Sequence, residues 1–361
     1  MKIGVDFREA SKKDKTGKGW FAYNLMKNVF EQDSKNQYIL YTDSIPADFS
    51  HFKNVEFRLI RGKSIFWHLK ALRDLKIEKP DLFLALTSFI IPALAPKNLK
   101  TIIVVHDLVA FLFPIKHNRK AVLIEKLTLK KALKKAIKII TISKSTESDL
   151  IKLFANKVVN LSEKITIIPC AASENFKKLS STEQKNPENF KYILGVGTLE
   201  PRKNFEKLIE AFSLISKAFD YLRLVIIGGK GWGFEKNESD KIIFKGYVAE
   251  KDLIHYYNSA EIFVFPSLYE GFGIPPLEAM QCGCPVIASN ISSMPEVIGS
   301  AGLLVNPTNA HELAEAIKSV LTNQDLRSRL VAQGLVQSQK FSYKLSAQKL
   351  IELFKKIAGV G

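Results

Sequence analysis

Strand-like and helix-like patterns alternate along the whole chain. Short runs of Ile, Val and Leu are separated by longer segments in which apolar residues recur every three or four positions. After a first run at residues 1–6, the runs that predict strands are Ile39–Thr42, Leu82–Leu86, Thr101–Val105, Ile137–Ile142, Tyr192–Val196, Leu222–Ile227, Ile242–Phe244, Ile262–Phe265 and Pro285–Ala288. Strands that alternate with helices form parallel sheets covered on both faces. The pattern therefore predicts an α/β protein with Rossmann-like sheets.

A polar segment divides the strands into two series. Residues 173–189 are rich in Lys, Ser, Glu and Asn and lack apolar periodicity, so we expect a linker there. A chain of 361 residues is also long for a single hydrophobic core. We therefore expect an N-terminal domain at 1–172 and a C-terminal domain at 190–340, facing each other across a deep cleft. An amphipathic helix at about 341–361 is expected to pack back on the first domain.

Positive charge is concentrated in the first part of the chain. The first 200 residues hold 35 Lys and Arg against 20 Asp and Glu, whereas the remainder holds 18 against 16. Segment 116–138 alone has nine basic residues and one acid, Glu125, with Lys126, Lys130 and Lys134 spaced every four positions. A basic amphipathic helix of this kind favours docking on an anionic membrane surface. A solvated lysine face on an ordinary packed helix explains the pattern equally well.

No window approaches the roughly 20 apolar residues that a membrane-spanning helix needs. The N-terminus enters a strand pattern directly, without the apolar stretch of a signal peptide. We therefore expect a cytoplasmic protein that is at most peripheral at the inner face of the cell membrane. The three cysteines, Cys170, Cys282 and Cys284, have neither disulfide nor zinc spacing and are interpreted as packing residues.

Two carboxylates bracket a turn rich in glycine and proline after the predicted strand Ile262–Phe265. Glycines let the backbone approach a ligand, and prolines suit a first helical turn. The N–H groups at such a helix start form a seat for phosphate or sugar hydroxyls, and here they belong to Phe272, Gly273 and Ile274. Carboxylates near a helix N-terminus favour their ionised form. Glu270 and Glu278 are therefore expected to accept hydrogen bonds from a sugar rather than to donate protons.

Further candidate side chains follow other predicted strands. Arg202 and Lys203 come soon after Tyr192–Val196 and precede a predicted helix, so they are expected at the carboxyl edge of the second sheet. Cations held there balance the charge that develops on a diphosphate leaving group. His106 likewise ends a predicted strand of the first sheet.

Taken together, these segments resemble the retaining glycosyltransferases of the GT-B fold, in the large group of bacterial mannosyl- and glucosyltransferases (glycosyltransferase family 4). The Glu-x7-Glu spacing of Glu270 and Glu278 is the most specific part of the resemblance. The likeness covers nearly the whole chain and is strongest over 190–310. The segments that carry it are 16–19 (TGKG), 105–108 (VHDL), 195–204 (GVGTLEPRKN), 246–248 (GYV) and 270–278 (EGFGIPPLE).

The resemblance implies a role for each of these segments. Lys203, Arg202 and Glu270 would act on the donor, and His106 would help to hold the transferred sugar. The resemblance implies that Gly17 and Gly19 lie in a glycine loop that approaches the donor phosphates, and that Gly246, Tyr247 and Val248 form a loop that meets the nucleobase. The other donor-binding positions that it implies are Phe272, Gly273, Ile274 and Glu278. Many relatives have a second arginine where this chain has Thr198, which leaves the role of Arg202 beside Lys203 open.

The expected function is transfer of a mannose- or glucose-type hexose from a nucleotide-sugar donor. The acceptor would be a glycan or a lipid-linked saccharide in surface polysaccharide biosynthesis, and the resemblance implies retention of the anomeric configuration. The chain contains no Asp-x-Asp pair, with which glycosyltransferases of the other common fold bind a divalent metal. We therefore expect no metal and no cofactor, because the nucleotide-sugar is a substrate.

Two alternatives stay open, one of them from another class of protein. A basic nucleic-acid-binding α/β protein would fit the isoelectric point of about 9.5. However, segment 116–138 has no aromatic residue for stacking, so no nucleic acid partner is expected. A nucleotide-sugar epimerase of the same architecture would lack the arrangement of Glu270 and Glu278.

Overall fold

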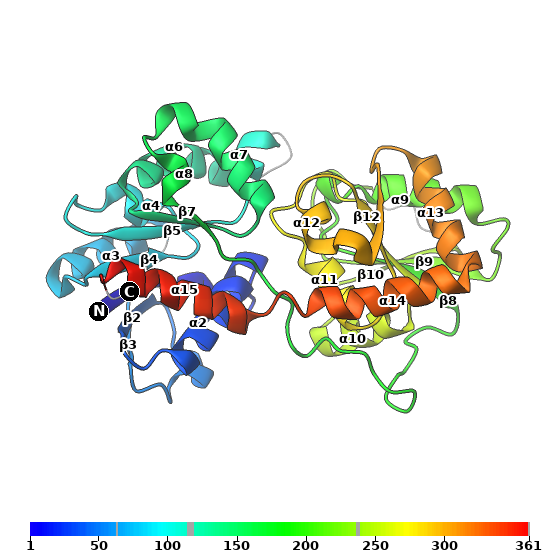
Figure 1. The fold of residues 1–361 in the computed structure, drawn as a ribbon, viewed down its shortest axis with the longest axis horizontal. Coiled ribbons are helices and arrows are strands. Elements are labelled where there is room, and N and C mark those ends of the chain that lie inside the picture. The colour runs from blue at the N-terminus through cyan, green and yellow to red at the C-terminus, as the bar shows by residue number, and fades with distance from the viewer. Residues whose placement is uncertain (63, 114–118, 236–238, 360–361) are drawn as a thin grey trace. The chain divides into compact units, whose positions relative to one another are not determined.

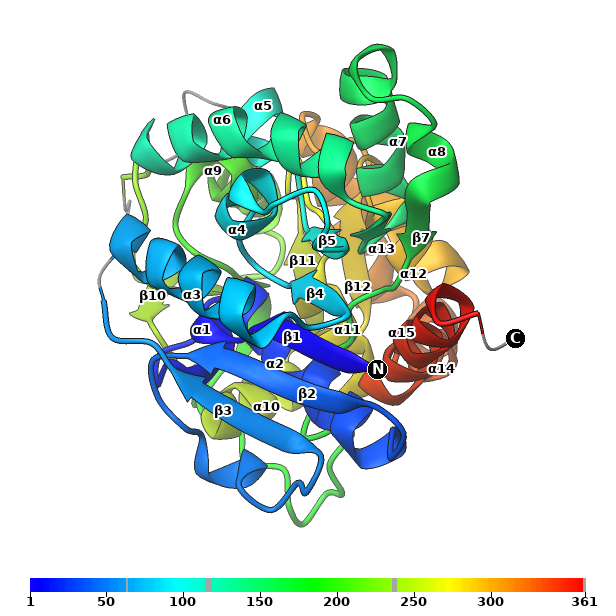
Figure 2. The same cartoon turned by 90° about the vertical axis from the view of Figure 1, so that its left-hand side faces the viewer.

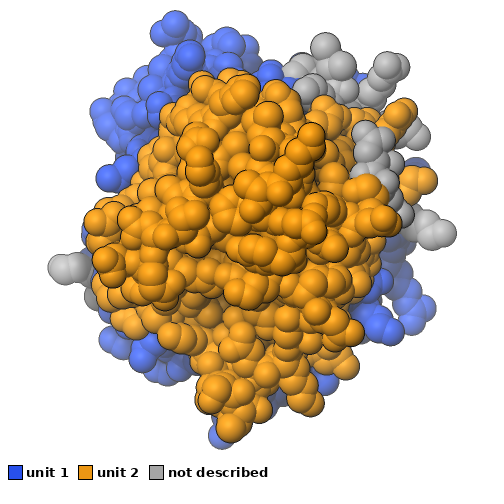
Figure 3. Space-filling view, turned by 90° about the vertical axis from the view of Figure 1, so that its right-hand side faces the viewer, with its two compact units in different colours: residues 1–170, 342–361 blue, residues 171–341 orange. Residues whose placement is uncertain are grey.

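The computed structural model describes all residues except 63, 114–118, 236–238 and 360–361. The chain forms two compact units (Figure 1). Unit 1 contains Met1–Cys170 and Ser342–Gly361, and unit 2 contains Ala171–Phe341 (Figure 3). The polypeptide therefore passes from one unit to the other twice.

Unit 1 is built on a seven-stranded parallel sheet with the strand order β3-β2-β1-β4-β5-β6-β7. The strands are β1 (Lys2–Asp6), β2 (Gln37–Thr42), β3 (Val55–Leu59), β4 (Leu82–Ala85), β5 (Thr101–Val105), β6 (Lys138–Thr141) and β7 (Ile165–Ile167). Every residue of β4 and β5 is buried. Such continuous apolar strands are typical of parallel sheets that are covered on both faces.

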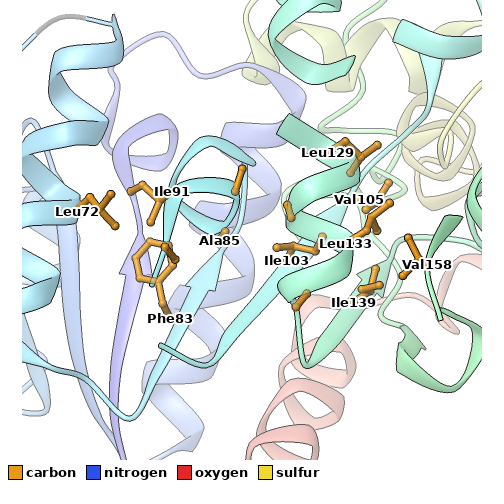
Figure 4. Packing of buried hydrophobic residues seen from close by; sticks show 14 of the residues in the cluster. Leu72, Phe83, Ala85, Ile91, Ile103, Val105, Leu129, Leu133, Ile139 and Val158 are labelled. Carbon is orange, nitrogen blue, oxygen red and sulfur yellow. The ribbon is translucent and has the colours of Figure 1, made fainter. Parts of the chain in front are cut away.

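Helices cover both faces of this sheet (Figure 2). The helices α3, α4, α6 and α7 enclose a core on one face that includes Leu72, Ile91, Leu129 and Leu133 (Figure 4). On the other face α2 packs against α15. The helices of the unit are α1 (Arg8–Ser11), α2 (Gly17–Gln32), α3 (Ser64–Glu78), α4 (Ile90–Leu94), α5 (Val109–Leu112), α6 (Arg119–Lys135), α7 (Lys144–Phe154), α8 (Leu161–Lys164) and α15 (Tyr343–Ile357), with 3-10 turns η1 (Ala47–Phe49) and η3 (Ala155–Lys157).

The C-terminal helix α15 belongs to unit 1 although most of the preceding chain belongs to unit 2. It starts at Tyr343 because the Ser342 side chain accepts a hydrogen bond from the backbone N–H of Leu345, which caps the helix. The Ser346 hydroxyl donates to the carbonyl of Pro169 at 2.7 Å. These contacts anchor the end of the chain to unit 1.

Unit 2 contains a six-stranded parallel sheet in the order β10-β9-β8-β11-β12-β13. The strands are β8 (Lys191–Val196), β9 (Leu222–Ile227), β10 (Ile242–Gly246), β11 (Ile262–Phe265), β12 (Val286–Ser289) and β13 (Gly302–Val305). The helices are η4 (Pro201–Lys203), α9 (Phe205–Ile215), α10 (Glu250–Ser259), α11 (Ile274–Gln281), α12 (Met294–Ile298), η5 (Gly299–Ala301), α13 (Ala310–Thr322) and α14 (Gln324–Ser338). The helices α9 and α13 pack together over one core of the sheet.

The prediction of two Rossmann-like parallel sheets is confirmed. β5, β9 and β11 have the bounds expected from their apolar runs. Residues 173–189, expected as a linker, lie within unit 2. The ring of Phe176 packs on Tyr257 with the ring centroids 5.7 Å apart, and the backbone N–H of Leu179 donates to Asn258 at 2.8 Å. The segment is polar because it crosses the surface of unit 2, where these contacts fix it to α10.

Candidate active site

Glycines bring three strand ends of unit 2 close together. A Cβ atom at Gly228, after β9, would lie 1.8 Å from the carbonyl oxygen of Gly197, which follows β8. The N–H of Gly228 donates to the carbonyl of Gly246, at the end of β10, at 2.8 Å. Only glycine allows so close an approach of two backbones at position 228. The carboxyl edge of the sheet is therefore formed by backbone, with little side-chain bulk.

The turn η4 places two cations beside this edge. Pro201 begins the turn, and Asn204 ends it in the left-handed conformation with φ 58°. Asparagine adopts this conformation more readily than most residues. The Asn204 side chain donates to the carbonyls of Pro266 at 3.0 Å and Pro307 at 2.7 Å. These bonds tie η4 to the loops after β11 and β13.

Lys203 and Arg202 of η4 both form ion pairs with Glu270. The distances to Oε1 of Glu270 are 2.6 Å from Nζ of Lys203 and 2.9 Å from a guanidinium nitrogen of Arg202. The Ser267 hydroxyl donates to the same oxygen at 2.6 Å. The side chains of Lys203, Arg202 and Glu270 are 11%, 17% and 12% exposed. Residues 67 positions apart in sequence thus form one buried charge cluster.

The protonation of this cluster follows from its burial and its charges. Burial raises the pKa of Glu270, but the charges of Lys203 and Arg202 outweigh it, so the net shift is downward. Burial, together with the charge of Arg202, holds the pKa of Lys203 below its usual value although Glu270 opposes the shift. The short contact between Lys203 and Glu270 indicates an ion pair. The carboxylate is the counter-charge that allows two cations to stay buried.

Arg202 is held by more partners than Lys203. Its guanidinium pairs with Glu200 and also donates to the backbone carbonyl of Tyr269. Lys203 instead lies above the Phe265 ring, 4.8 Å from its centroid, and donates a hydrogen bond to Glu270. Arg202 therefore links η4 to the loop that carries Glu270, and Lys203 is the more deeply buried cation of the two.

Serines 292 and 293 fix the backbone on both sides of Glu270. The Ser292 hydroxyl accepts from the Glu270 N–H at 3.0 Å and donates to the Glu270 carbonyl at 2.6 Å. The Ser293 hydroxyl lies within hydrogen-bond distance of the carbonyls of Glu270 and Phe272. The sequence analysis missed both serines, because a Ser-Ser pair after a predicted strand has no distinctive spacing.

The turn before α11 has the shape that its glycines and prolines predicted. Gly273 is the N-cap of α11 with φ 101°, and a Cβ there would lie 2.2 Å from the Met294 methyl carbon. Phe272 is buried against Phe341, with ring centroids 5.5 Å apart. α11 then begins at Ile274. Phe272, Gly273 and Ile274, whose N–H groups are predicted to bind the donor, therefore lie at the N-terminus of this helix.

Glu278 lies one turn inside α11 and is hydrogen-bonded to the Tyr257 hydroxyl at 2.8 Å. The expectation that Glu278 is ionised needs correction. Burial, with the nearby charge of Glu250, raises the pKa of Glu278 to about 7, although the Tyr257 bond opposes the shift. Glu270 owes its low pKa to two buried cations, and no cation is among the groups that shift the pKa of Glu278.

The predicted nucleobase loop ends β10. Gly246 has φ 69°, the left-handed region that favours glycine. Tyr247 is 84% exposed, and Val248 is half-buried. Lys245, just before the loop, pairs with Glu188 at 2.7 Å. The loop therefore presents backbone and one aromatic ring at the same carboxyl edge of the sheet as Gly197 and Gly228.

The remaining predicted residues belong to unit 1. His106, after β5, is buried, and its Nε2 lies 2.7 Å from the carbonyl oxygen of Leu86. Burial, with the charge of Lys18, lowers the pKa of His106 to about 4, so the imidazole is neutral at pH 7. Its ring also packs edge-on against Phe21, with centroids 5.0 Å apart. His106 is therefore a neutral side chain that Leu86 and Phe21 hold in place after β5.

Gly17 and Gly19 lie in a helix and not in the expected loop. They form the first turn of α2, where the Thr16 side chain accepts from the Gly19 N–H at 3.4 Å. A Cβ at Gly19 would lie 2.7 Å from the carbonyl oxygen of Glu9, whereas Gly17 has open space around it. The loop expectation overlooked Thr16 as a helix cap.

Two further features are absent from the described residues. No group of three or more His, Cys, Asp and Glu side chains is arranged to hold a metal ion. In the same part of the chain no helix has the length and apolarity to cross a membrane.

Sequence comparison relates this chain to known glycosyltransferases. Residues 176–336 match the model of the family described as Glycosyl transferases group 1. O-antigen chain mannosyltransferase B from Escherichia coli is 31% identical over 83% of this chain and 79% of its own length. Serotype-specific mannosyltransferase WbdA from Escherichia coli is also 31% identical over 72% of this chain, but the match spans only 34% of that longer protein.

Solved structures share the fold at low sequence identity. The structure of Anabaena Alr3699/HepE in complex with UDP-glucose has a TM-score of 0.76 and 17% identity, with 99% of this chain and 100% of that chain covered. This likeness shows the GT-B arrangement of two Rossmann-like domains. The 31% identity over most of both chains, together with this fold, shows that the chain belongs to the group 1 glycosyltransferases.

Proposed function

We propose that the protein is a retaining, metal-independent hexosyltransferase of glycosyltransferase family 4. It would transfer a mannose-type hexose, with glucose as the second candidate, from a nucleotide-sugar to a glycan or lipid-linked saccharide in surface polysaccharide synthesis. The mannosyltransferase relatives of O-antigen chains support this sugar and acceptor class. The structural neighbour with UDP-glucose supports a nucleoside diphosphate sugar as the donor class.

The observation that carries the proposal is the pairing of Lys203 and Arg202 with Glu270 at the carboxyl edge of the unit 2 sheet. Two buried cations there would stabilise the charge that grows on a departing nucleoside diphosphate. Without a donor, Glu270 and Glu200 balance the two cations. With a donor bound, the diphosphate would take over this role, and Glu270 would be free to accept hydrogen bonds from hydroxyls of the sugar.

Donor hydrolysis by the purified protein tests the proposal. A panel of UDP- and GDP-linked hexoses would be incubated with and without EDTA, and release of the nucleoside diphosphate would be measured. We expect turnover of at least one donor, unchanged by EDTA. The anomeric configuration of a transfer product, read by NMR, would test retention. An inverted product would contradict the retaining assignment without affecting the transferase assignment.

Matched variants connect this activity to the charge cluster. Lys203→Ala and Glu270→Ala should each abolish donor turnover, because they remove the diphosphate cation and its buried partner. Lys318→Ala serves as the control, since Lys318 is an exposed lysine of the same unit, 54% accessible. Wild-type turnover by either cluster variant would refute the site. Salt-sensitive DNA binding with no turnover of any donor would favour the nucleic-acid-binding alternative.

A further inference from the structure

Over the described side chains from 122 to 135, the exposed face of α6 consists of leucine, isoleucine and lysine. From 122 to 135, the exposed residues are Leu123, Ile124, Lys126, Leu127, Lys130, Lys131, Lys134 and Lys135. Leu123, Ile124 and Leu127 are 59%, 44% and 62% exposed, although the opposite side of the helix already packs in the core. A solvated helix face is normally polar, so these three side chains need another explanation. Residues 116–118 of the predicted basic segment lie outside the described residues.

Helix α3 presents the same combination of residues. From 65 to 78, its exposed residues are Ile65, Phe66, Leu69, Lys70, Arg73, Lys76 and Ile77. Phe66 and Ile77 are 69% and 70% exposed. The sequence analysis did not identify this face, because a core tryptophan and leucines interrupt the basic positions.

Acidic side chains are turned away from both faces. On α3, Glu78 pairs with Lys2 and Arg58, and the carboxylate of Asp74 lies 3.9 Å from Arg58. On α6, the one acid from 122 to 135 is Glu125, which is part-buried and interacts with Lys18. The exposed cations of the two faces have no acidic partner among the described residues. Lys135 donates instead to the carbonyls of Ala93 and Ala95, and Lys70 to that of Arg61, so no carboxylate balances these charges.

The two faces lie on one side of unit 1. Both helices contribute to the same core over the sheet, and α4 packs against each of them (Figure 2). Leu94 of α4 adds a further exposed apolar side chain, 46% accessible. On the opposite side of the sheet, the exposed face of α15 carries one apolar residue, Leu345, among lysines, and these are mixed with Glu352 and Gln348. Between 65 and 78 and between 122 and 135, by contrast, several apolar side chains and no acidic one are exposed.

We propose that the outward faces of α3 and α6 dock on an anionic lipid bilayer. Lipid headgroups would supply the counter-charges for the lysines, and the acyl boundary would remove the leucine, isoleucine and phenylalanine side chains from water. A nucleic acid could satisfy the cations but would leave most of these aliphatic side chains exposed. The proposal does not rest on the proposed enzymatic function, since it concerns only the surface of unit 1.

Vesicle binding of the full-length protein tests this directly. The protein would be mixed with vesicles of phosphatidylglycerol and phosphatidylcholine, or of phosphatidylcholine alone, and separated by flotation. We expect binding to the anionic vesicles that weakens with salt, and little binding to the neutral ones. Donor hydrolysis measured on the same preparation keeps failure of this proposal distinct from failure of the proposed function.

Paired variants locate the surface. Lys126→Glu/Lys130→Glu should weaken vesicle binding by at least about thirtyfold, because each lysine near an anionic surface contributes about 1 kcal/mol. Its control, Lys349→Glu/Lys356→Glu, makes the same charge change on exposed positions of α15 and should bind clearly better. Because the two variants have the same net charge, a difference in their vesicle binding reports the position of the lysines and not the total charge of the protein.

A second pair tests the apolar contribution. Leu123→Gln/Leu127→Gln should reduce binding at high salt, where the electrostatic part is screened. The control Leu345→Gln, at an α15 leucine that is 44% exposed, should leave binding unchanged. Equal loss in the α6 and α15 variants, or tight binding to duplex DNA with none to anionic vesicles, would overturn the proposal.

Discussion

Replacing Glu270 with glutamine isolates the contribution of one carboxylate charge. The change keeps the size of the side chain but leaves Lys203 and Arg202 buried without their shared counter-charge. Breaking a buried pair by removing one partner costs about 3–5 kcal/mol. The three side chains are at most 17% exposed, so solvent screening gives little relief. For a unit of this size, that loss corresponds to a fall in the melting temperature of about 10 °C.

Calorimetric unfolding of the wild type and of Glu270→Gln would measure this difference. The control is Glu315→Gln, because Glu315 is 73% exposed and lies 3.8 Å from Lys318, where an ion pair contributes about 0.5 kcal/mol or less. A Glu270→Gln/Lys203→Met double variant should recover part of the loss, since one uncompensated cation is removed with the carboxylate.

The pH dependence gives an independent check with a defined sign. Because the cations lower the pKa of Glu270 in the folded state, its stabilisation is present above the unfolded pKa of about 4.3. It is lost as the pH falls through the folded pKa. The difference in the free energy of unfolding between the wild type and Glu270→Gln should therefore become smaller toward pH 3. A gap below about 1 kcal/mol at pH 7, or one that stays constant down to pH 3, would refute this reasoning.

Three further predictions follow from single positions. Gly228→Ala should lower the free energy of unfolding in urea by about 3 kcal/mol, because its Cβ would lie 1.8 Å from the Gly197 carbonyl oxygen. The control Gly229→Ala, which has open space around it, should leave the free energy of unfolding nearly unchanged. Folding raises the pKa of Glu278 to about 7, so its ionisation in the folded state destabilises the protein as the pH rises from about 4.5 past 7. The Glu278→Gln variant should therefore have a higher melting temperature than the wild type at pH 8 but not at pH 5. NMR should show no protonation of His106 between pH 5 and 8, because its pKa is about 4; a titration near pH 6.5 would contradict its burial.

The central strands could be predicted from the sequence because burial on both faces leaves an uninterrupted apolar run. Thr101–Val105 and Leu222–Ile227 are such runs, and their predicted bounds match the structure. The strands that were missed have another character. Val55–Leu59 at a sheet edge alternates polar and apolar residues. Ile165–Ile167 and Gly302–Val305, also at sheet edges, are only partly buried. An edge strand receives its partner from tertiary structure, so its local pattern is weak.

The candidate site was predictable where function requires particular residue types at fixed spacing. The resemblance singled out Lys203 and Glu270 together although 67 positions separate them, and the structure places them in contact. The roles of Ser292 and Ser293 depend on where two loops meet, which the sequence pattern does not encode. The protonation of Glu278 depends on burial beneath α10, which overrode the expectation from its place near a helix start.

The return of α15 to unit 1 has a consequence for biosynthesis on the ribosome. The apolar face of α15, including Tyr343, Leu350 and Phe354, is buried in unit 1, yet it is translated only after all of unit 2. The first 170 residues must therefore wait, with part of their α2 surface uncovered, until Tyr343–Ile357 has left the exit tunnel. A nascent chain stalled before position 342 would carry a complete unit 2 beside an unfinished unit 1. Such a chain would be a natural client for chaperones that bind exposed apolar helices.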